Sequence, residues 1–112
     1  MSAPVTNDVF ILGKVFATLV MTDSDFPWIR GTFTPGPAFN EYESFVVPME
    51  WDLEAEHLDL MALEASGVPL SQVRWGTPDK NGASYLHALH LYNARAQAGW
   101  RFGPEPISFE DA

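Results

Sequence analysis

The chain has no cysteine in its 112 residues. This excludes a disulfide framework, a thiolate nucleophile and a metal site built on cysteine. Long apolar runs are also missing, since none approaches the ~20 residues that a membrane-spanning helix needs. The first residues, MSAPVTND, lack the basic segment that opens a signal peptide. We therefore expect a cytoplasmic protein without membrane contact.

Basic residues are scarce. Six Lys and Arg stand against fifteen Asp and Glu, which gives a formal net charge of -9 at pH 7. A negative field of this size repels phosphate backbones, so nucleic acid is not expected as a partner. Hydrophobic residues make up 46% of the chain, which is too apolar for a disordered protein.

The acids are concentrated in one part of the chain. No Lys or Arg occurs between Arg30 and Arg74. Eight carboxylates fall inside that interval: Glu41, Glu43, Glu50, Asp52, Glu54, Glu56, Asp59 and Glu64. One interpretation is a solvated acidic surface that keeps the protein soluble. The other is a docking surface for a basic partner.

The N-terminal part predicts two strands joined by a hairpin. Residues 8–21, DVFILGKVFATLVM, are rich in Val, Ile and Phe and predict one long strand in which Gly13 marks a bulge or a close backbone neighbour. The short polar residues of TDSDFP favour a turn. Residues 28–34 then form the second strand, with alternate side chains on opposite faces.

Two helices are expected next. The Pro-Gly-Pro sequence at 35–37 forces a turn, and apolar residues at helical spacing then predict a helix over residues 37–46. The following MEWDLEAE alternates apolar and acidic residues, but Asp and Glu are poor strand formers and Asp52 is a good N-cap. We therefore predict a second helix over residues 53–66, with Gly67 just past its C-terminus.

The C-terminal part predicts further strands. Residues 68–75, VPLSQVRW, have strand character, and residues 76–84 form a loop. The segment YLHALHLYNARAQAGWRF is compatible with a helix or with two strands that turn near Asn93 to Arg95. The turn-forming Asn93 and the strand-forming GWRF favour the hairpin.

These elements predict an α+β fold. It consists of an antiparallel sheet of four or five strands with two helices on one face, in the order β-β-α-α-β-β-β. A chain of this length can bury one core without help from disulfides. We expect one compact domain over residues 1–112, with an irregular tail at 103–112.

The segment SDFPWIRGTFTPGPAFNEYESF combines Asp-x-Pro-Trp, a short strand ending in Gly-x-Phe, and Pro-x-Pro-Ala-Phe at the start of a helix. In these features it resembles a group of small uncharacterised bacterial proteins. The segment YLHALHLYNARAQAGWRFG is similar to the closing hairpin of that group, with Trp100 and Arg101 at corresponding places. The resemblance implies the strand-strand-helix beginning and the final hairpin. It implies no activity.

The aromatic residues of this segment have two interpretations. Trp28 and Phe33 lie on the second strand. Phe39 and Tyr42 lie on the following helix, so the Pro-Gly-Pro corner can fold the rings into a buried cluster. Alternatively, Trp28 is exposed beside Arg30 as a contact patch, because Trp and Arg are enriched in interface hot spots.

Three arginines lie close to tryptophans in the sequence. If the strands align, Arg30, Arg74 and Arg101 form a cationic island able to hold the carboxylate or phosphate of a small ligand. The alternative is that they pair with the protein's own carboxylates and lay their stems across aromatic rings. The candidate ligand-binding residues are therefore Trp28, Arg30, Arg74 and Arg101.

No motif in the sequence specifies catalysis. A nucleophile elbow, a P-loop and a dinucleotide fingerprint are all missing. His57, His87 and His90 are possible metal ligands, but residues three apart on a strand point to opposite faces, and the spacing defines no site. We assign no catalytic residue, metal or cofactor, and enzymatic activity is left open.

The excess of acidic residues is therefore the main indication of function. We expect a non-catalytic protein-interaction domain of the inhibitory, immunity or accessory kind, whose acidic side binds a basic protein partner. The candidate partner-binding residues are Glu50, Glu54, Glu56 and Asp59. The alternative is a small-ligand-binding or enzymatic domain with a pocket between sheet and helices. Homo-oligomerisation is compatible with both.

Overall fold

The computed structural model describes residues 6–25, 28–50, 52, 54–77 and 84–107. Its strands are β1 (Thr6–Ile11), β2 (Lys14–Asp25), β3 (Trp28–Pro35), β4 (Val46–Pro48), β5 (Glu56–Leu58), β6 (Val73–Gly76), β7 (Ser84–Tyr92) and β8 (Gln97–Gly103). The helical elements are α1 (Phe39–Tyr42), α2 (Leu60–Ala65) and the 3-10 turns η1 (Glu43–Phe45) and η2 (Leu70–Gln72). No helix in this described part of the chain is long and apolar enough to cross a membrane.

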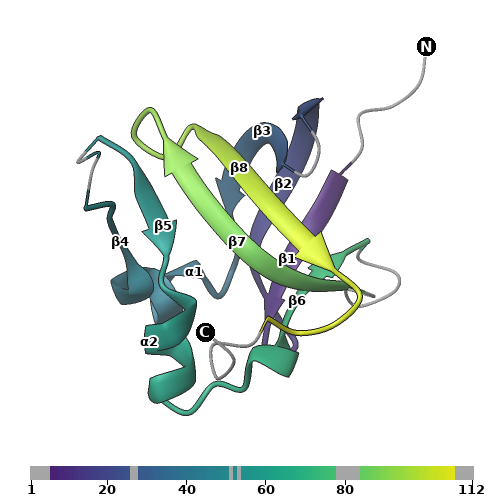
Figure 1. Ribbon diagram of the computed structural model, residues 1–112, viewed down its shortest axis with the longest axis vertical. Helices are drawn as coiled ribbons and strands as arrows, with labels where there is room; N and C mark the ends of the chain where they lie inside the picture. The colour runs from purple at the N-terminus through teal and green to yellow at the C-terminus, as the bar shows by residue number, and fades with distance from the viewer. Residues whose placement is uncertain (1–5, 26–27, 51, 53, 78–83, 108–112) are drawn as a thin grey trace.

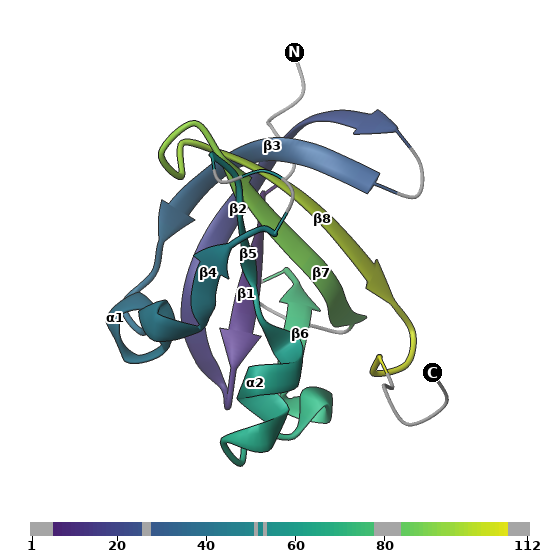
Figure 2. The same cartoon turned by 60° about the vertical axis from the view of Figure 1, so that its left-hand side comes forward.

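Six of the strands close into an antiparallel barrel (Figure 1). Their order is β1-β2-β3-β8-β7-β6, and β6 pairs with β1 to complete the ring. One edge of β7 pairs with β8 along most of its length. The other edge pairs first with β6, at Tyr85, and later with β5, at His90. The short hairpin of β4 and β5 therefore extends from the end of β7 (Figure 2).

This architecture corrects the predicted fold class. The predicted sheet had four or five strands and two helices on one face, in the order β-β-α-α-β-β-β. The structure instead has a closed six-stranded barrel with two further strands and one helix of more than a single turn, α2. A flat sheet has two open edges, and closure into a barrel removes them. The inner face of a barrel is buried by its own side chains, so no layer of helices is needed to cover it.

The predicted long strand over residues 8–21 is wrong in one respect, because it is two strands. Leu12 and Gly13 both have positive φ, at 52° and 78°, and Ile11 pairs with Lys14. This is a two-residue hairpin turn, in which both central residues are left-handed. Gly13 is typical of such a turn, but Leu12 is not, because leucine rarely adopts a positive φ. The sequence therefore did not predict this turn.

The two predicted helices are shorter than expected. The helix predicted over residues 37–46 is one turn, α1, followed by η1 and then by strand β4. The helix predicted over residues 53–66 begins only at Leu60, because Glu56–Leu58 pairs with both β4 and β7. Sheet pairing has overridden local helix propensity in this segment. The N-cap is consequently Asp59 and not Asp52.

Several local predictions are confirmed. The final hairpin is formed by β7 and β8, which turn at residues 93–96. The second strand corresponds to β3, which pairs with β2. Gly67 lies directly after the C-cap Ser66 with a φ of 108°, and the Val68 N–H donates to the Leu63 carbonyl. These features depend on turn and cap chemistry, which acts within a few residues.

Side chains fill the barrel. Trp100, Leu19, Leu89 and Val9 are among the fully buried residues, together with Ile11, Leu86, Leu91 and Val73. The Pro-Gly-Pro corner is anchored to β2, because the Gly36 N–H donates to the Phe16 carbonyl over 2.8 Å. It places the Phe39 ring 5.2 Å from Phe16 and 5.7 Å from Phe33. This part of the aromatic segment is therefore core, as the corner interpretation predicts.

Substitution of the α2 N-cap tests whether Asp59 is structural. The Asp59 carboxylate accepts the Ala62 N–H over 3.0 Å, so Asp59→Ala leaves a helix N–H without its acceptor. We expect a loss of about 1 kcal/mol in the free energy of unfolding, measured in urea. The control is Glu64→Ala on the same helix, whose exposed side chain should change stability by less than about 0.5 kcal/mol. Equal stabilities for the two variants would contradict a capping role.

Candidate functional site

One row of side chains crosses the outer face of the sheet on four neighbouring strands. Arg30 on β3 lies opposite Gly99 on β8, Gly99 lies opposite His90 on β7, and His90 lies opposite His57 on β5. Cross-strand partners point to the same face, and residues two apart on a strand do as well. Trp28 and Tyr92 therefore belong to this face too. We call these six residues the His90 face: Trp28, Arg30, His57, His90, Tyr92 and Gly99.

His90 is the centre of this face. Its ring centroid lies 4.8 Å from that of Trp28 and 6.4 Å from that of His57. The Tyr92 hydroxyl lies 3.4 Å from His90 Nδ1. Burial lowers the pKa of His90, and the neighbouring His57 lowers it further. His90 is consequently neutral at pH 7, so it presents one N–H donor and one acceptor nitrogen.

Three surface hollows meet at His90. The first has a volume of about 450 Å³ and is lined by Trp28, Arg30, His90, Tyr92, Gln97 and Gly99. The second, of about 350 Å³, lies between the histidine pair and the loop after β4, with Met49 and Glu50 in its wall. The third, of about 180 Å³, reaches α2. This last space is the hollow that lies between sheet and helix, and it is smaller than the ~300 Å³ of typical ligand pockets.

The arginines predicted to bind a ligand are divided between two places. Arg101 lies over the Trp28 ring, with its guanidinium carbon 5.6 Å from the ring centroid. Together with Arg30 it lies at the Trp28 side of the His90 face. Arg74 is on β6, where its guanidinium carbon lies 4.8 Å from the Tyr85 centroid. The structure therefore brings Trp28, Arg30 and Arg101 together and leaves Arg74 near the opposite end of β7.

The four acids predicted to bind a partner have different surroundings. Glu50 lines the second hollow, beside the histidine pair. Glu54 is exposed and, with Asp52, lines a fourth hollow of about 640 Å³ that also includes Tyr92 and the β7–β8 turn. Glu56 is bound by Arg95, and Asp59 caps α2. Two of the four carboxylates thus already have partners within the fold.

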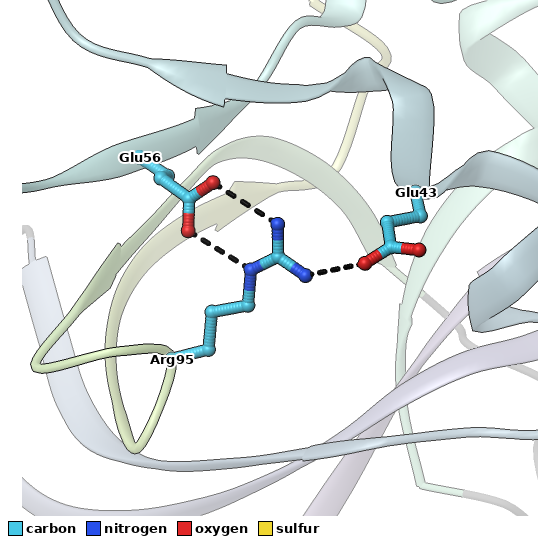
Figure 3. Close-up of polar contacts among 3 residues, drawn as sticks. All are labelled: Glu43, Glu56 and Arg95. Atoms are coloured by element: carbon cyan, nitrogen blue, oxygen red, sulfur yellow. Dashed lines mark hydrogen bonds and ion pairs between the residues drawn. The ribbon is translucent and has the colours of Figure 1, made fainter.

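Arg95 connects three segments that are distant in the sequence (Figure 3). Its Nε and Nη2 donate to the two carboxylate oxygens of Glu56 over 2.9 and 3.0 Å, and its Nη1 donates to Glu43 over 2.7 Å. Its guanidinium also lies over the Phe39 ring. The hydrogen bonds from Arg95 lower the pKa of the Glu56 carboxyl. This clamp fixes the β7–β8 turn against the β4–β5 hairpin, and both border the fourth hollow.

The sequence suggested a role for His57 and His90 only as metal ligands, and none for Tyr92. His90 and Tyr92 are two apart on a strand, which places them on one face, and this signal was available once the hairpin was preferred. His57 was not placed beside His90 because its segment was predicted as helix. Asp52 was predicted as an N-cap. Its carboxylate instead accepts the Glu54 N–H over 3.1 Å and holds the acidic loop in a turn.

The protein is a small closed β-barrel with several hollows on its outer surface. Among the described residues, no three His, Asp or Glu side chains are grouped in a way that could hold a metal ion. No family model, curated protein or solved structure matches the chain.

Proposed function

We propose that this protein is a non-catalytic protein-interaction domain, of the inhibitory, immunity or accessory kind, that binds a basic partner at the His90 face and the adjoining acidic loop. The observation that carries the proposal is the position of Tyr92. Tyr92 is 38% exposed and lines two hollows. One contains Trp28 and Arg30, and the other contains Asp52 and Glu54.

The aromatic centre of the face supports binding to a protein. Trp, Tyr and Arg dominate interface hot spots because they bury a large area with few freely rotating bonds. Trp28 and His90 are half-buried and already packed together, so they lose little conformational freedom when a partner covers them. The hydrogen bonds of Arg95 likewise hold the β7–β8 turn in place, so this turn also loses little conformational freedom on binding.

The charge around this centre favours a basic partner. Glu50, Asp52 and Glu54 are exposed on the loop between β4 and β5. The whole chain carries a formal net charge of -9, so its field attracts a cationic protein and raises the association rate at low salt. A Lys or Arg side chain of the partner can enter the fourth hollow and lie between two carboxylates and the Tyr92 ring.

The test is capture of partners from host lysate by the tagged protein and by a loop variant, Asp52→Asn with Glu54→Gln. We expect the wild type to retain a stoichiometric basic protein at low salt and to release it at high salt. The loop variant should bind this partner roughly tenfold more weakly, because a charge-dependent contact at two carboxylates is lost. Titration of the purified partner measures the affinities.

A charge-matched control separates a local contact from net charge. Glu64→Gln with Glu105→Gln removes the same number of charges, at one position in α2 and one position after β8. Figure 1 shows α2 and the end of β8 away from the loop that joins β4 to β5. We expect this variant to bind like the wild type. Equal weakening in both double variants would show that only net charge matters. Enrichment of the chain itself as the sole partner would replace the proposal with homo-oligomerisation.

A further inference from the structure

The β4–β5 hairpin is joined to the barrel by a short strand pairing. Among the described residues, β5 pairs with β7 at two positions, Glu56 with Leu91 and His57 with His90. β4 is the outermost strand and pairs with β5. Each of the two β5 residues also makes a side-chain contact, because the His57 ring faces His90 and the Glu56 carboxylate accepts hydrogen bonds from Arg95. The attachment of the hairpin therefore depends in part on groups that titrate.

The histidine pair is suited to the neutral state. The two ring centroids lie 6.4 Å apart on cross-strand partners, which point to the same face. When both imidazoles are protonated, two like charges stand opposite each other, and this destabilises a strand pair. The Trp28 ring, 4.8 Å from that of His90, covers part of His90 and raises the cost of charging it.

The charged and titratable groups around the pair have both signs. They line the hollows that contain His90 or lie over Trp28, and they are the acids Glu50 and Asp59, the bases Arg30, Arg101 and His87, and the Tyr92 hydroxyl. The pKa of His90 is nevertheless lowered, first by burial and then by the neighbouring His57. The two acids therefore do not offset burial and repulsion at His90.

The lowered pKa gives the direction of the pH response. The folded state binds the His90 proton more weakly than the unfolded state, in which an imidazole has a pKa of about 6.5. The stabilisation is therefore complete above about pH 6.5 and is lost as the pH falls through the lowered pKa. The pKa of the Glu56 carboxyl is lowered from 4.5, so its contact with Arg95 stays intact in mild acid.

We propose that the His57–His90 pair is an acid-sensitive switch that keeps the β4–β5 hairpin paired with β7 at neutral pH and loosens this pairing in mild acid. The switch is a property of the chain by itself. Its consequence for a basic partner rests on the proposed function, because loosening displaces the loop that carries Asp52 and Glu54. Two positive imidazoles then also lie on the His90 face, so affinity for a basic partner falls in mild acid.

Hydrogen exchange of the ¹⁵N-labelled protein tests the switch without any partner. Protection factors of backbone amides, which correct for the intrinsic pH dependence of exchange, are compared at about pH 7 and about pH 5. We expect the β5 amides to lose at least about tenfold in protection in acid, and the amides of the β2–β3 pairing to change less than about twofold. Equal β5 protection at the two pH values, or an equal loss in both regions, would overturn the proposal.

Three variants show whether the histidine pair is responsible. His57→Gln and His90→Gln each remove one of the two facing charges, so the acid response of β5 should fall to about threefold or less. His87→Gln is the control. It removes an imidazole that contacts the Glu105 carbonyl, where glutamine can also donate, and it should keep the full response. A wild-type response in folded His57→Gln and His90→Gln would rule the switch out.

Amide spectra at neutral pH report the folding of each variant. Because no partner is used, these measurements can fail while the acidic-loop variant still behaves as expected, and the reverse is also true. The switch and the proposed function are therefore tested separately.

Discussion

Gly31→Ala should destabilise the barrel by about 3 kcal/mol or more. A Cβ built on Gly31 would lie 1.9 Å from the Val20 carbonyl oxygen and 3.0 Å from Trp100 Cη2. The first contact is with backbone of the paired strand β2, which cannot move without breaking the β2–β3 ladder. The second is with the fully buried tryptophan of the core. The barrel has to shift on both sides of β3 to admit one methyl group.

Chemical denaturation and thermal unfolding measure this effect, and Gly99→Ala is a matched control. Gly99 is also buried and lies on the strand paired with β3, but its Cβ would meet nothing nearer than 3.6 Å. The control should change the free energy of unfolding by no more than about 1 kcal/mol. A midpoint for Gly31→Ala close to that of Gly99→Ala would mean that β2 and β3 are not packed as closely as described.

Arg95→Met should lower the free energy of unfolding by about 2 kcal/mol at pH 7. This is the second large effect that we expect. Methionine keeps an apolar stem near Phe39 but removes all three hydrogen bonds to Glu56 and Glu43. Hydrogen bonds to charged groups contribute about 1.5 to 3 kcal/mol, and Glu56 is left half-buried without its cation. The exposed bond to Glu43 contributes the smaller part. Urea denaturation of wild type and variant measures the difference.

The pH dependence of this difference has a defined sign. Because Arg95 lowers the pKa of Glu56 below its usual value of 4.5, the folded state binds the Glu56 proton more weakly than the unfolded state. The stabilisation is therefore complete above pH 4.5 and is lost as the pH falls through the lowered pKa. The stability gap between wild type and Arg95→Met should narrow below pH 4.5. A gap that stays constant down to pH 2 would contradict the clamp.

The control for Arg95→Met is Lys14→Met. Lys14 also forms an ion pair, with Glu41 over 3.2 Å, but both side chains are more than half exposed. Exposed pairs of this kind contribute little, so we expect a change below about 0.5 kcal/mol. A loss as large as that of Arg95→Met would show that net charge, and not burial of the clamp, determines stability in this protein.

Three local features were predictable because their causes are local. Asn93 and its neighbours indicated the turn of the final hairpin, and Gly67 indicated the end of α2. The Pro-Gly-Pro corner was predicted from the missing N–H groups of proline. In each case the deciding interaction joins residues that are close in the chain, so the sequence pattern contains it.

The helix predicted over Glu56 to Leu58 was wrong because the deciding interaction here joins residues that are distant in the chain. The alternating pattern of MEWDLEAE, which ends at Glu56, was compatible with a strand, but its Asp, Glu and Ala residues are poor strand formers and favoured a helix. The strand forms because β7 offers an unpaired edge to His57. His90 on that edge lies 33 positions from His57 in the sequence, so no pattern within the segment could reveal the pairing.

The His90 face depends on the same long-range pairing. The sequence by itself determined the excess of acids, the closing hairpin, the aromatic corner and the presence of Trp28 and Arg30 on one side of one strand. Only the tertiary structure decided that the sheet closes into a barrel and that Arg95 donates hydrogen bonds to Glu56. It also decided that His57 and His90, 33 positions apart, are cross-strand neighbours and that His90 lies beside Trp28. Strand register decides these contacts, and register is an energetic property of the whole ring of strands.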